Sequence, residues 1–230
     1  MIISIEAQIG AGKSSLIDQL KTAKFHKPHL VIPEQVSEWT SIKDESGKNI
    51  LELFYTDKKK YSYMFQSFVL FSRVHHLLKT VKENPNTIIV CERSHLTDLM
   101  VFAQSLLELE DLQTIEMTVY KQWHEMIRDL FKLNISGFVY LKASPETCMK
   151  RIIERSRSGE STIDMSYLNL LHEKHEDWLY TKNGFDKQSG KPVLVLDGEI
   201  HKSSTGREEQ IATIVEFVRK IEHDRPDWCW

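Results

Sequence analysis

The sequence predicts a three-layer α/β fold, in which a five-stranded parallel sheet is flanked by helices. Short runs rich in Val, Ile and Leu alternate with longer stretches of helical periodicity, which is typical of a parallel sheet. These runs are almost continuously apolar, as strands are when helices cover both faces of a sheet. The 230 residues contain no internal repeat and no low-complexity linker, so we expect a single domain over residues 1–230.

The individual elements follow from these patterns in chain order. The predicted strands cover residues 2–6, 29–33, 87–91, 137–143 and 192–196. The clearest helical pattern covers 63–81, and two further stretches of helix length cover 164–180 and 207–221. Segments rich in Ser, Gly and charged residues predict loops at 44–48, 156–161 and 198–207.

Composition and charge narrow the choice of partners. The net charge of −3 provides no general field that would attract nucleic acid, so we expect no nucleic-acid partner. No apolar run approaches the roughly 20 residues of a membrane-spanning helix, and we expect no membrane anchor. The first predicted strand leaves no room for a leader ahead of it, and three widely spaced cysteines fit free thiols. Together these features predict a cytoplasmic protein.

The segment after the first strand predicts a phosphate-binding loop. Residues 7–14 read Ala-Gln-Ile-Gly-Ala-Gly-Lys-Ser and lead into a helical pattern. The backbone N–H groups of such a loop point at nucleotide phosphates, with Lys13 beside the β and γ oxygens and the Ser14 hydroxyl on Mg²⁺. A glycine-rich turn that merely enters a helix is the alternative, which the Gly-Lys-Ser sequence disfavours. The residues expected to bind the nucleotide here are Gly10, Gly12, Lys13, Ser14 and Ser15.

The loop departs from the usual pattern at its first position, where Ala7 replaces glycine. If that position required a positive φ, the Cβ atom would cost on the order of 1 kcal/mol. Gly10 could restore conformational freedom nearby.

Charged residues stand at the carboxyl ends of two other strands, where open α/β sheets bind ligands. Glu34 follows the second strand, and Glu92 and Arg93 end the third. A buried strand does not end in unpaired charges, because their burial costs several kcal/mol. The alternatives are a solvated loop glutamate for Glu34 and a structural salt bridge between Glu92 and Arg93.

Four further segments resemble the cellular deoxyribonucleoside kinases, the family of deoxycytidine and deoxyguanosine kinases. They are Pro33-Glu34-Gln35-Val36 with Trp39, Phe65-Gln66 with Ser72-Arg73, Glu92-Arg93-Ser94 with Asp98, and the arginine stretch 151–160 leading into 171–176. The resemblance covers most of the chain, although the family's usual proline after the glutamate is Gln35 here. It implies a P-loop kinase of nucleotide salvage that moves the γ-phosphate of ATP onto the 5′-hydroxyl of a deoxyribonucleoside, with Mg²⁺.

The resemblance also implies roles for the strand-end charges. Glu34 would be the base that accepts the proton of the 5′-hydroxyl, and Arg93 would approach the reacting phosphoryl group together with Lys13. Glu92 would hold Mg²⁺ with Ser14, directly or through water.

The nucleoside pocket is predicted around one face of a helix. Gln66, Val69 and Arg73 are spaced i, i+3, i+7 and share that face. By resemblance, Gln66 and an Arg73–Asp98 pair read the base, which favours deoxycytidine or a purine deoxynucleoside over thymidine. The aromatic residues implied could equally be core packing. The implied substrate-binding residues are Glu34, Trp39, Phe54, Tyr55, Phe65, Gln66, Val69, Arg73, Arg93, Asp98, Phe102 and Glu160, of which Tyr55 and Glu160 would hold the sugar 3′-hydroxyl.

Arg151, Arg155 and Arg157 lie at one helix end and in the following loop. Solvated arginines favoured by the helix dipole are one interpretation. By resemblance they form a lid over about residues 151–161 that closes on the ATP phosphates.

Two alternative functions remain open. The resemblance also implies an oligomeric state. A nucleoside monophosphate kinase shares the loop and lid, but it needs a cationic cradle rather than a base at the second strand. A catalytically inactive structural member of the family is the other rival, as in an accessory subunit of respiratory complex I. The resemblance implies a homodimer through the helices after Glu92 and the helix at 164–180.

Overall fold

The computed structural model describes residues 1–230 except 157–159, 161–162, 201–203 and 225–230. Its sheet consists of the strands β1 (Ile2–Glu6), β2 (His29–Ile32), β3 (Ile88–Glu92), β4 (Gly137–Lys142) and β5 (Val193–Asp197). The strands lie in the order β2-β3-β1-β4-β5, and every neighbouring pair is parallel. The order places the carboxyl ends of β1, β2 and β3 side by side, which brings three of the segments of interest to one edge.

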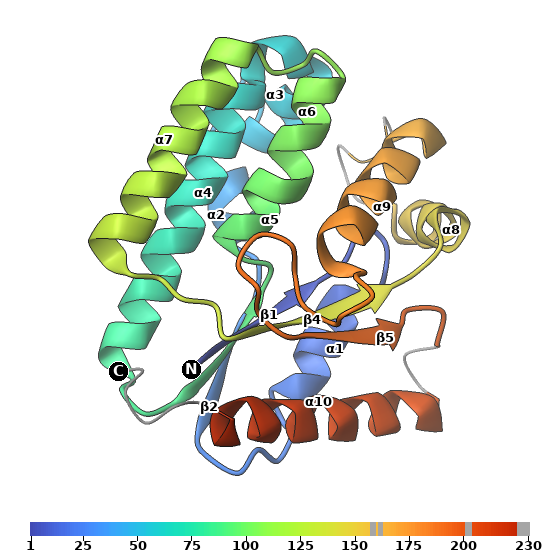
Figure 1. Cartoon of the computed structure of the whole chain (residues 1–230). Coiled ribbons are helices and arrows are strands. Elements are labelled where there is room, and N and C mark those ends of the chain that lie inside the picture. The colour runs from blue at the N-terminus through green and yellow to red at the C-terminus, as the bar shows by residue number, and fades with distance from the viewer. Residues whose placement is uncertain (157–159, 161–162, 201–203, 225–230) are drawn as a thin grey trace.

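Helices cover both faces of this sheet, as Figure 1 shows. The helices α1 (Lys13–Leu20) and α10 (Thr205–His223) lie on one side, and the remaining helices lie on the other or beyond the strand ends. These are α2 (Val36–Ser41), α3 (Ile50–Thr56), α4 (Lys58–Glu83), α5 (His95–Thr97), the π-helical segment η1 (Asp98–Ala103), α6 (Gln104–Glu108), α7 (Thr114–Phe131), α8 (Pro145–Arg155) and α9 (Met165–Leu179). The three-layer α/β prediction is confirmed.

The buried apolar residues form two cores, one around the sheet and one among the helices beyond the strand ends. The first joins β1, β3 and β4 to α1, α9 and α10, and residues such as Ile5, Phe138 and Trp178 are fully buried in it. The second lies among α2, α3, α4, η1, α6 and α7 and includes Trp39, Phe54 and Phe65. The substrate-sized cavity described below is lined by residues of both regions.

Most of the predicted elements are confirmed with small shifts in their bounds. Each strand differs from its prediction by one residue or less at either end, whereas α4 begins five residues earlier than the predicted helix. The predicted loop 198–207 overlaps the first turn of α10. No helix was predicted over α7, although its buried residues Met117, Tyr120, His124 and Ile127 recur at helical spacing.

Within the described residues, no helix combines the length and apolar character needed to cross a membrane. Cys91 and Cys148 are buried free thiols, as expected, and Cys229 lies outside the described residues.

Candidate active site

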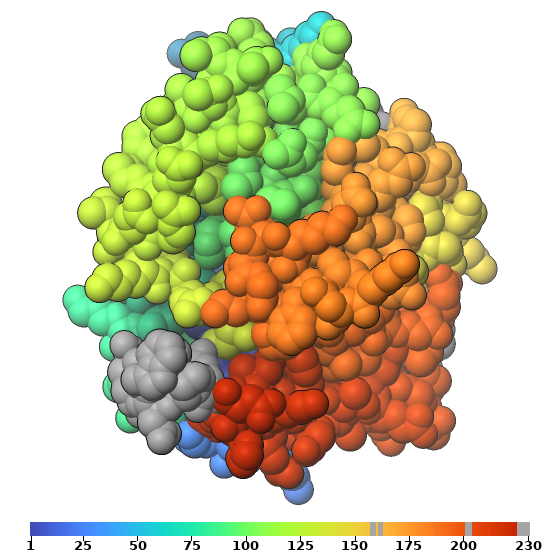
Figure 2. Space-filling view, viewed as in Figure 1, coloured from blue at the N-terminus to red at the C-terminus, as the bar shows by residue number. Residues whose placement is uncertain are grey.

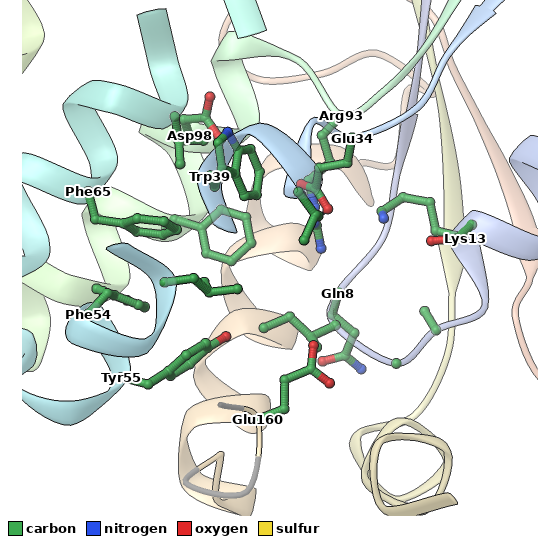
Figure 3. A pocket seen from close by; sticks show the side chains of 18 of the residues that line it. Gln8, Lys13, Glu34, Trp39, Phe54, Tyr55, Phe65, Arg93, Asp98 and Glu160 are labelled. Carbon is green, nitrogen blue, oxygen red and sulfur yellow. Dashed lines mark hydrogen bonds and ion pairs between the residues drawn. The ribbon is translucent and has the colours of Figure 1, made fainter. Parts of the chain in front are cut away.

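A cavity of about 260 Å³ runs from the loop after β1 to the middle of α4. Figure 3 shows Glu34 and Arg93 between Lys13 on one side and the aromatic side chains of α2, α3 and α4 on the other. Tyr55 and Glu160 lie near each other along another side of the cavity. The cavity therefore has a phosphate end, a central charged cluster and an aromatic end.

The phosphate end is a loop whose backbone depends on two glycines. Gly10 and Gly12 have φ angles of 83° and 91°, in the left-handed region that side chains disfavour. A Cβ atom on Gly10 would lie 2.4 Å from the carbonyl oxygen of Cys148, so any side chain would force the loop away from α8. No side chain among the described residues caps α1, which leaves its first N–H groups available to an anion.

Ala7 is tolerated at the first position of the loop because that position does not need glycine's freedom. Its φ is negative, and its side chain is fully buried. Its carbonyl oxygen accepts a hydrogen bond from Arg93 Nη2 at 3.1 Å. Ala7 therefore carries none of the strain that a Cβ atom would cause at a positive φ.

Lys13 and Ser14 both contact the carboxylate of Glu92. The Lys13 Nζ and Ser14 Oγ atoms lie 2.6 and 2.8 Å from Glu92 Oε1. Burial raises the pKa of Glu92, but the charge of Lys13 and the hydrogen bonds from Lys13 and the Glu34 N–H together lower it by more, so the net shift is downward. Burial and the neighbouring Arg93 lower the pKa of Lys13.

These contacts fit a magnesium site of the kind that needs substrate phosphates to complete it. A hydroxyl and a carboxylate oxygen are the hard ligands that Mg²⁺ prefers, and Ser14 and Glu92 present them together. The described residues contain no group of three or more His, Cys, Asp or Glu side chains that could hold a metal ion alone. Ser14 and Glu92 are therefore the residues of this chain that would hold the ion.

Glu34 is the centre of the charged cluster. Arg93 Nη1 donates to both of its carboxylate oxygens, at 2.7 and 3.0 Å, and Arg73 Nη2 donates at 3.2 Å. Burial raises the pKa of Glu34, but Arg93, Lys13 and Arg73 outweigh burial and hold that pKa far below its usual range. Glu34 is thus a part-buried, ionised carboxylate whose side chain is 14% exposed, and the solvated-loop alternative is wrong.

Arg73 connects this cluster to the aromatic end. Its Nε and Nη2 atoms donate to Asp98 at 3.0 and 3.3 Å, and its Nη1 atom donates to the Glu92 carbonyl oxygen at 2.9 Å. Burial raises the pKa of Asp98 to about 6, against the opposing charge of Arg73. Gln66 lies about two turns before Arg73 on α4, and its Oε1 atom has no hydrogen-bond partner among the described residues.

Aromatic rings form the wall of the cavity beside Gln66. Phe54 stacks on Phe65 at a centroid distance of 4.6 Å, and Trp39 meets Phe65 edge-on at 5.9 Å. The guanidinium carbon of Arg93 lies 5.0 Å from the centre of the Phe102 ring. These rings are part of the core and of the cavity wall at once, so both interpretations of the aromatic residues hold.

The lid arginines have other partners in this structure. Arg151 Nη1 donates to the carbonyl oxygens of Ala11 and Gly198 at 3.1 and 2.8 Å. Arg155 forms a two-pronged pair with Glu160, with Nε and Nη2 at 2.9 and 2.7 Å from its oxygens. Neither arginine is merely solvated at a helix end.

The structure brings nearly all of the predicted site residues together. The cavity is lined by the predicted residues Gly10, Gly12, Lys13, Ser14, Ser15, Glu34, Trp39, Phe54, Tyr55, Phe65, Gln66, Val69, Arg73, Arg93, Asp98, Phe102, Arg151, Arg155 and Glu160. Glu92 joins them through Lys13 and Ser14, whereas Arg157 lies outside the described residues. The predicted alternative of a Glu92–Arg93 salt bridge is wrong, because each pairs with another residue.

Sequence reasoning missed several lining residues. Leu51 and Tyr167 line the cavity from α3 and α9, and Gln8 lines it from the loop. Tyr167 lies near the start of an amphipathic helix, where its side chain has the same pattern as a core residue. In the structure, α9 packs against η1, and Tyr167 lines the cavity from this helix.

Comparison with known proteins agrees with this geometry. Residues 3–221 match the family model described as deoxynucleoside kinase. The chain belongs to the deoxynucleoside kinase family. It is an ATP-dependent kinase, as the loop and the charged cluster indicate.

Individual relatives within the family are similar over most of their length. "Deoxycytidine kinase 1" of Xenopus laevis is 34% identical over 240 aligned positions, covering 95% of this chain and 89% of the relative. "Deoxycytidine kinase" of Homo sapiens is 34% identical over 216 positions, covering 85% and 82%. "Deoxyguanosine kinase, mitochondrial" of Xenopus laevis is 32% identical over 216 positions, covering 86% and 81%.

Proposed function

We propose that this deoxynucleoside kinase transfers the γ-phosphate of ATP to the 5′-hydroxyl of deoxycytidine or a purine deoxynucleoside in preference to thymidine. The observation that carries the proposal is the buried Arg73–Asp98 pair at the far end of the cavity from Lys13. A base held by this pair and by Gln66 places its sugar between the base and the phosphate loop. The 5′-hydroxyl then lies towards Glu34.

The pair supports base recognition by its hydrogen-bonding chemistry. Asp98 presents acceptors suited to an exocyclic amino group, and the Gln66 amide can pair with a base edge in two-pronged fashion. A thymine offers a carbonyl oxygen where cytosine offers an amino group, and a carbonyl facing Asp98 leaves a buried carboxylate without its donor. The names of the relatives that act on deoxycytidine and deoxyguanosine support the same preference.

Glu34 is proposed as the group that accepts the proton of the 5′-hydroxyl. Its low pKa makes it a weak base in the resting site. A loose phosphoryl-transfer transition state demands little proton transfer until late, so a weak base suffices. As phosphates enter and attract Arg93, Glu34 loses its closest partner and becomes more basic.

The cations are proposed to stabilise the charge that develops on the transferred group. Lys13 and Arg93 lie on either side of the cavity near Glu34 in Figure 3, and both would approach the γ-phosphate as it meets the 5′ oxygen. Magnesium held by Ser14 and Glu92 would supply charge neutralisation at the phosphates when bound. Arg155 and Arg151 would exchange their present partners for phosphate oxygens, and Tyr55 with Glu160 would hold the sugar 3′-hydroxyl.

Neither rival function fits the site as well. A monophosphate acceptor needs cations with charge to spare, whereas Arg73 and Arg93 are paired with Asp98 and Glu34. An inactive structural relative has no need to keep Glu34 buried among three cations, because burial of a carboxylate is costly.

We further propose a cytoplasmic homodimer. Large apolar side chains are exposed on α4, at Met64 and Phe71, and on α7, at Ile115, Met126 and Leu130. The α7 residues are spaced as one helical stripe, and α7 lies along the surface in Figure 2. This face includes one of the helices after Glu92, as expected, while the apolar residues of α9 are mostly buried. Light scattering of the wild type and of Leu130→Asp tests the assembly.

The function is tested by offering the purified protein ATP, Mg²⁺ and each natural deoxynucleoside, together with the monophosphates of deoxycytidine, deoxyguanosine and thymidine. The expected result is 5′-phosphorylation of deoxycytidine or a purine deoxynucleoside. A preference for thymidine would refute the role of Arg73 and Asp98 while leaving the kinase intact. Turnover of monophosphates alone would support the rival enzyme, and absence of all turnover would support the inactive relative.

A further inference from the structure

A buried carboxylate outside the cavity is bonded to the segment that carries Arg93. Glu6 ends β1, is fully buried and is not among the described residues that line the cavity. Its Oε1 atom accepts hydrogen bonds from Ser4 Oγ at 2.6 Å and Ser94 Oγ at 3.2 Å, and its Oε2 atom accepts one from Thr97 Oγ1 at 2.6 Å. Burial raises the pKa of Glu6, and hydroxyl donors from two different segments oppose that shift only in part.

The bond from Thr97 has a fixed direction. The backbone N–H of Ser94 donates to Thr97 Oγ1 at 3.0 Å. The Thr97 hydroxyl accepts that bond and donates in turn to Glu6 Oε2 at 2.6 Å. The peptide group that follows Arg93 is therefore linked to Glu6 through the Thr97 hydroxyl.

Arg93 has a backbone conformation that needs such support. Its φ of 63° lies in the left-handed region, which a residue with a long side chain rarely adopts. Its N–H donates to the Ile5 carbonyl oxygen at 3.0 Å, and its Nη2 atom donates to the Ala7 carbonyl oxygen at 3.1 Å. Strained conformations persist where the surroundings over-determine them, and here the consecutive residues 5, 6 and 7 all contribute.

We propose that Glu6 is a positioning residue for Arg93. Through Ser94 and Thr97 it holds the backbone of Arg93 in the conformation that directs the guanidinium group to Glu34 and to the reacting phosphoryl group. The inference rests on the catalytic role proposed above for Arg93. Because Glu6 does not touch either substrate, its loss should lower kcat more than it raises KM.

The first test compares Thr97→Val and Glu6→Gln with the control Ser4→Ala. Thr97→Val keeps the shape of the side chain and removes the hydroxyl between Ser94 and Glu6. Ser4→Ala also removes a hydrogen bond to Glu6, but on the β1 side. We expect Thr97→Val and Glu6→Gln to lower kcat about 10- to 100-fold, as small misplacements of catalytic groups do. Both should keep the KM for deoxycytidine and ATP within about threefold, and Ser4→Ala should keep kcat within about twofold.

The second test asks whether the effect passes through Arg93. In an Arg93→Ala background, Thr97→Val should lower kcat no further, because the group that it positions is already gone. Losses that simply multiply in the double variant would overturn the proposal, as would a wild-type kcat in both Thr97→Val and Glu6→Gln. If one of these two variants fails to fold, judged by loss of stabilisation by ATP, the other decides by the same criterion.

The outcomes separate this inference from the function on which it rests. A wild-type kcat in Arg93→Ala would refute the proposed role of Arg93 and with it the role of Glu6. Loss of activity in Arg93→Ala with full activity in Glu6→Gln and Thr97→Val would refute the role of Glu6 alone.

Discussion

The charged groups at the two ends of the cavity differ in what they are paired with. At the nucleoside end, Arg73 joins the two carboxylates of Glu34 and Asp98 in one buried cluster. At the ATP end, Arg151 is bonded to backbone carbonyl oxygens and Arg155 to Glu160. Under the proposed function, the acceptor side is therefore assembled before substrates bind, whereas the donor side would exchange partners to reach phosphates.

Burial accounts for this difference. The side chain of Arg73 is 5% exposed, and that of Arg155 is 35% exposed. A buried cluster resists rearrangement because every broken pair leaves an uncompensated charge. An exposed pair is weaker and screened by solvent, so it can be exchanged for the stronger charge of a triphosphate. Substitutions at the acceptor side should therefore affect recognition and chemistry, and those at the lid should affect the use of ATP.

Apart from the substitution of Glu34, the largest effect is expected at Lys13, which contacts Glu92 and would face the phosphates in the proposed mechanism. Lys13→Met should lower kcat/KM for ATP by about 10³-fold, because it removes a preorganised charge from the transition state. Binding of deoxycytidine, measured by calorimetry without ATP, should be retained. Lys21→Met, an exposed lysine just past the same helix, is the matched control. Equal losses in the two variants would contradict the role of Lys13.

Asp98→Asn should produce the next largest effect. Loss of a charged acceptor should lower kcat/KM for deoxycytidine by about 10- to 100-fold, chiefly through KM. The pKa of Asp98 is raised to about 6 by burial, so the carboxylate of the wild type gains a proton as the pH falls below that value. The KM for deoxycytidine should therefore rise about three- to tenfold between pH 7 and pH 5. That rise should be absent in Asp98→Asn, and its persistence would assign it to another group.

A smaller effect is expected at the lid. Arg155→Met should lower kcat about tenfold, because one of several cations near the phosphates is lost. The dissociation constant of deoxycytidine without ATP should stay within about threefold, although Glu160 loses the ion pair with Arg155. Lys150→Met, on the exposed face of the same helix, controls for loss of charge. A selective loss of nucleoside binding in Arg155→Met would place this arginine on the acceptor side.

The smallest effect is expected for Ala7→Gly. Ala7 has a negative φ, so kcat/KM should stay within about twofold of the wild type. Gly10→Ala is the contrasting variant, because its new Cβ atom would lie 2.4 Å from the Cys148 carbonyl oxygen. Its melting temperature should fall by about 4 °C or more, as measured by calorimetry. A gain of activity in Ala7→Gly would mean that the loop is impaired by its alanine.

The fold and most site residues could be predicted because their signals are local. Strand β1 and the loop that follows it lie within 14 residues, and Glu34 and Glu92 stand directly at or after strand ends. A parallel sheet brings such ends together whatever the details of packing. The resemblance supplied the rest, since no local pattern distinguishes Gln66 from a solvated glutamine.

The resemblance implied the Arg73–Asp98 pair, but the other pairings within the site could not be predicted. Arg73 could have approached Asp98 alone, and only the packing of α4 against η1 and β3 brings it to Glu34 as well. Tyr167 is indistinguishable from a core residue in the sequence of α9. The role of Glu6 depends on the left-handed backbone conformation of Arg93, which cannot be predicted from the residue types in the sequence.

The most direct test of the whole account is the kcat of Glu34→Gln, measured together with its affinity for deoxycytidine. The cluster holds Glu34 ionised beside the expected position of the 5′-hydroxyl, so removing its charge should lower kcat by about 10²- to 10⁴-fold. The dissociation constant of deoxycytidine should change by less than about fivefold, because Arg73, Asp98 and Gln66 hold the base. A kcat close to that of the wild type would contradict the assignment of Glu34 as the base and the mechanism built on it.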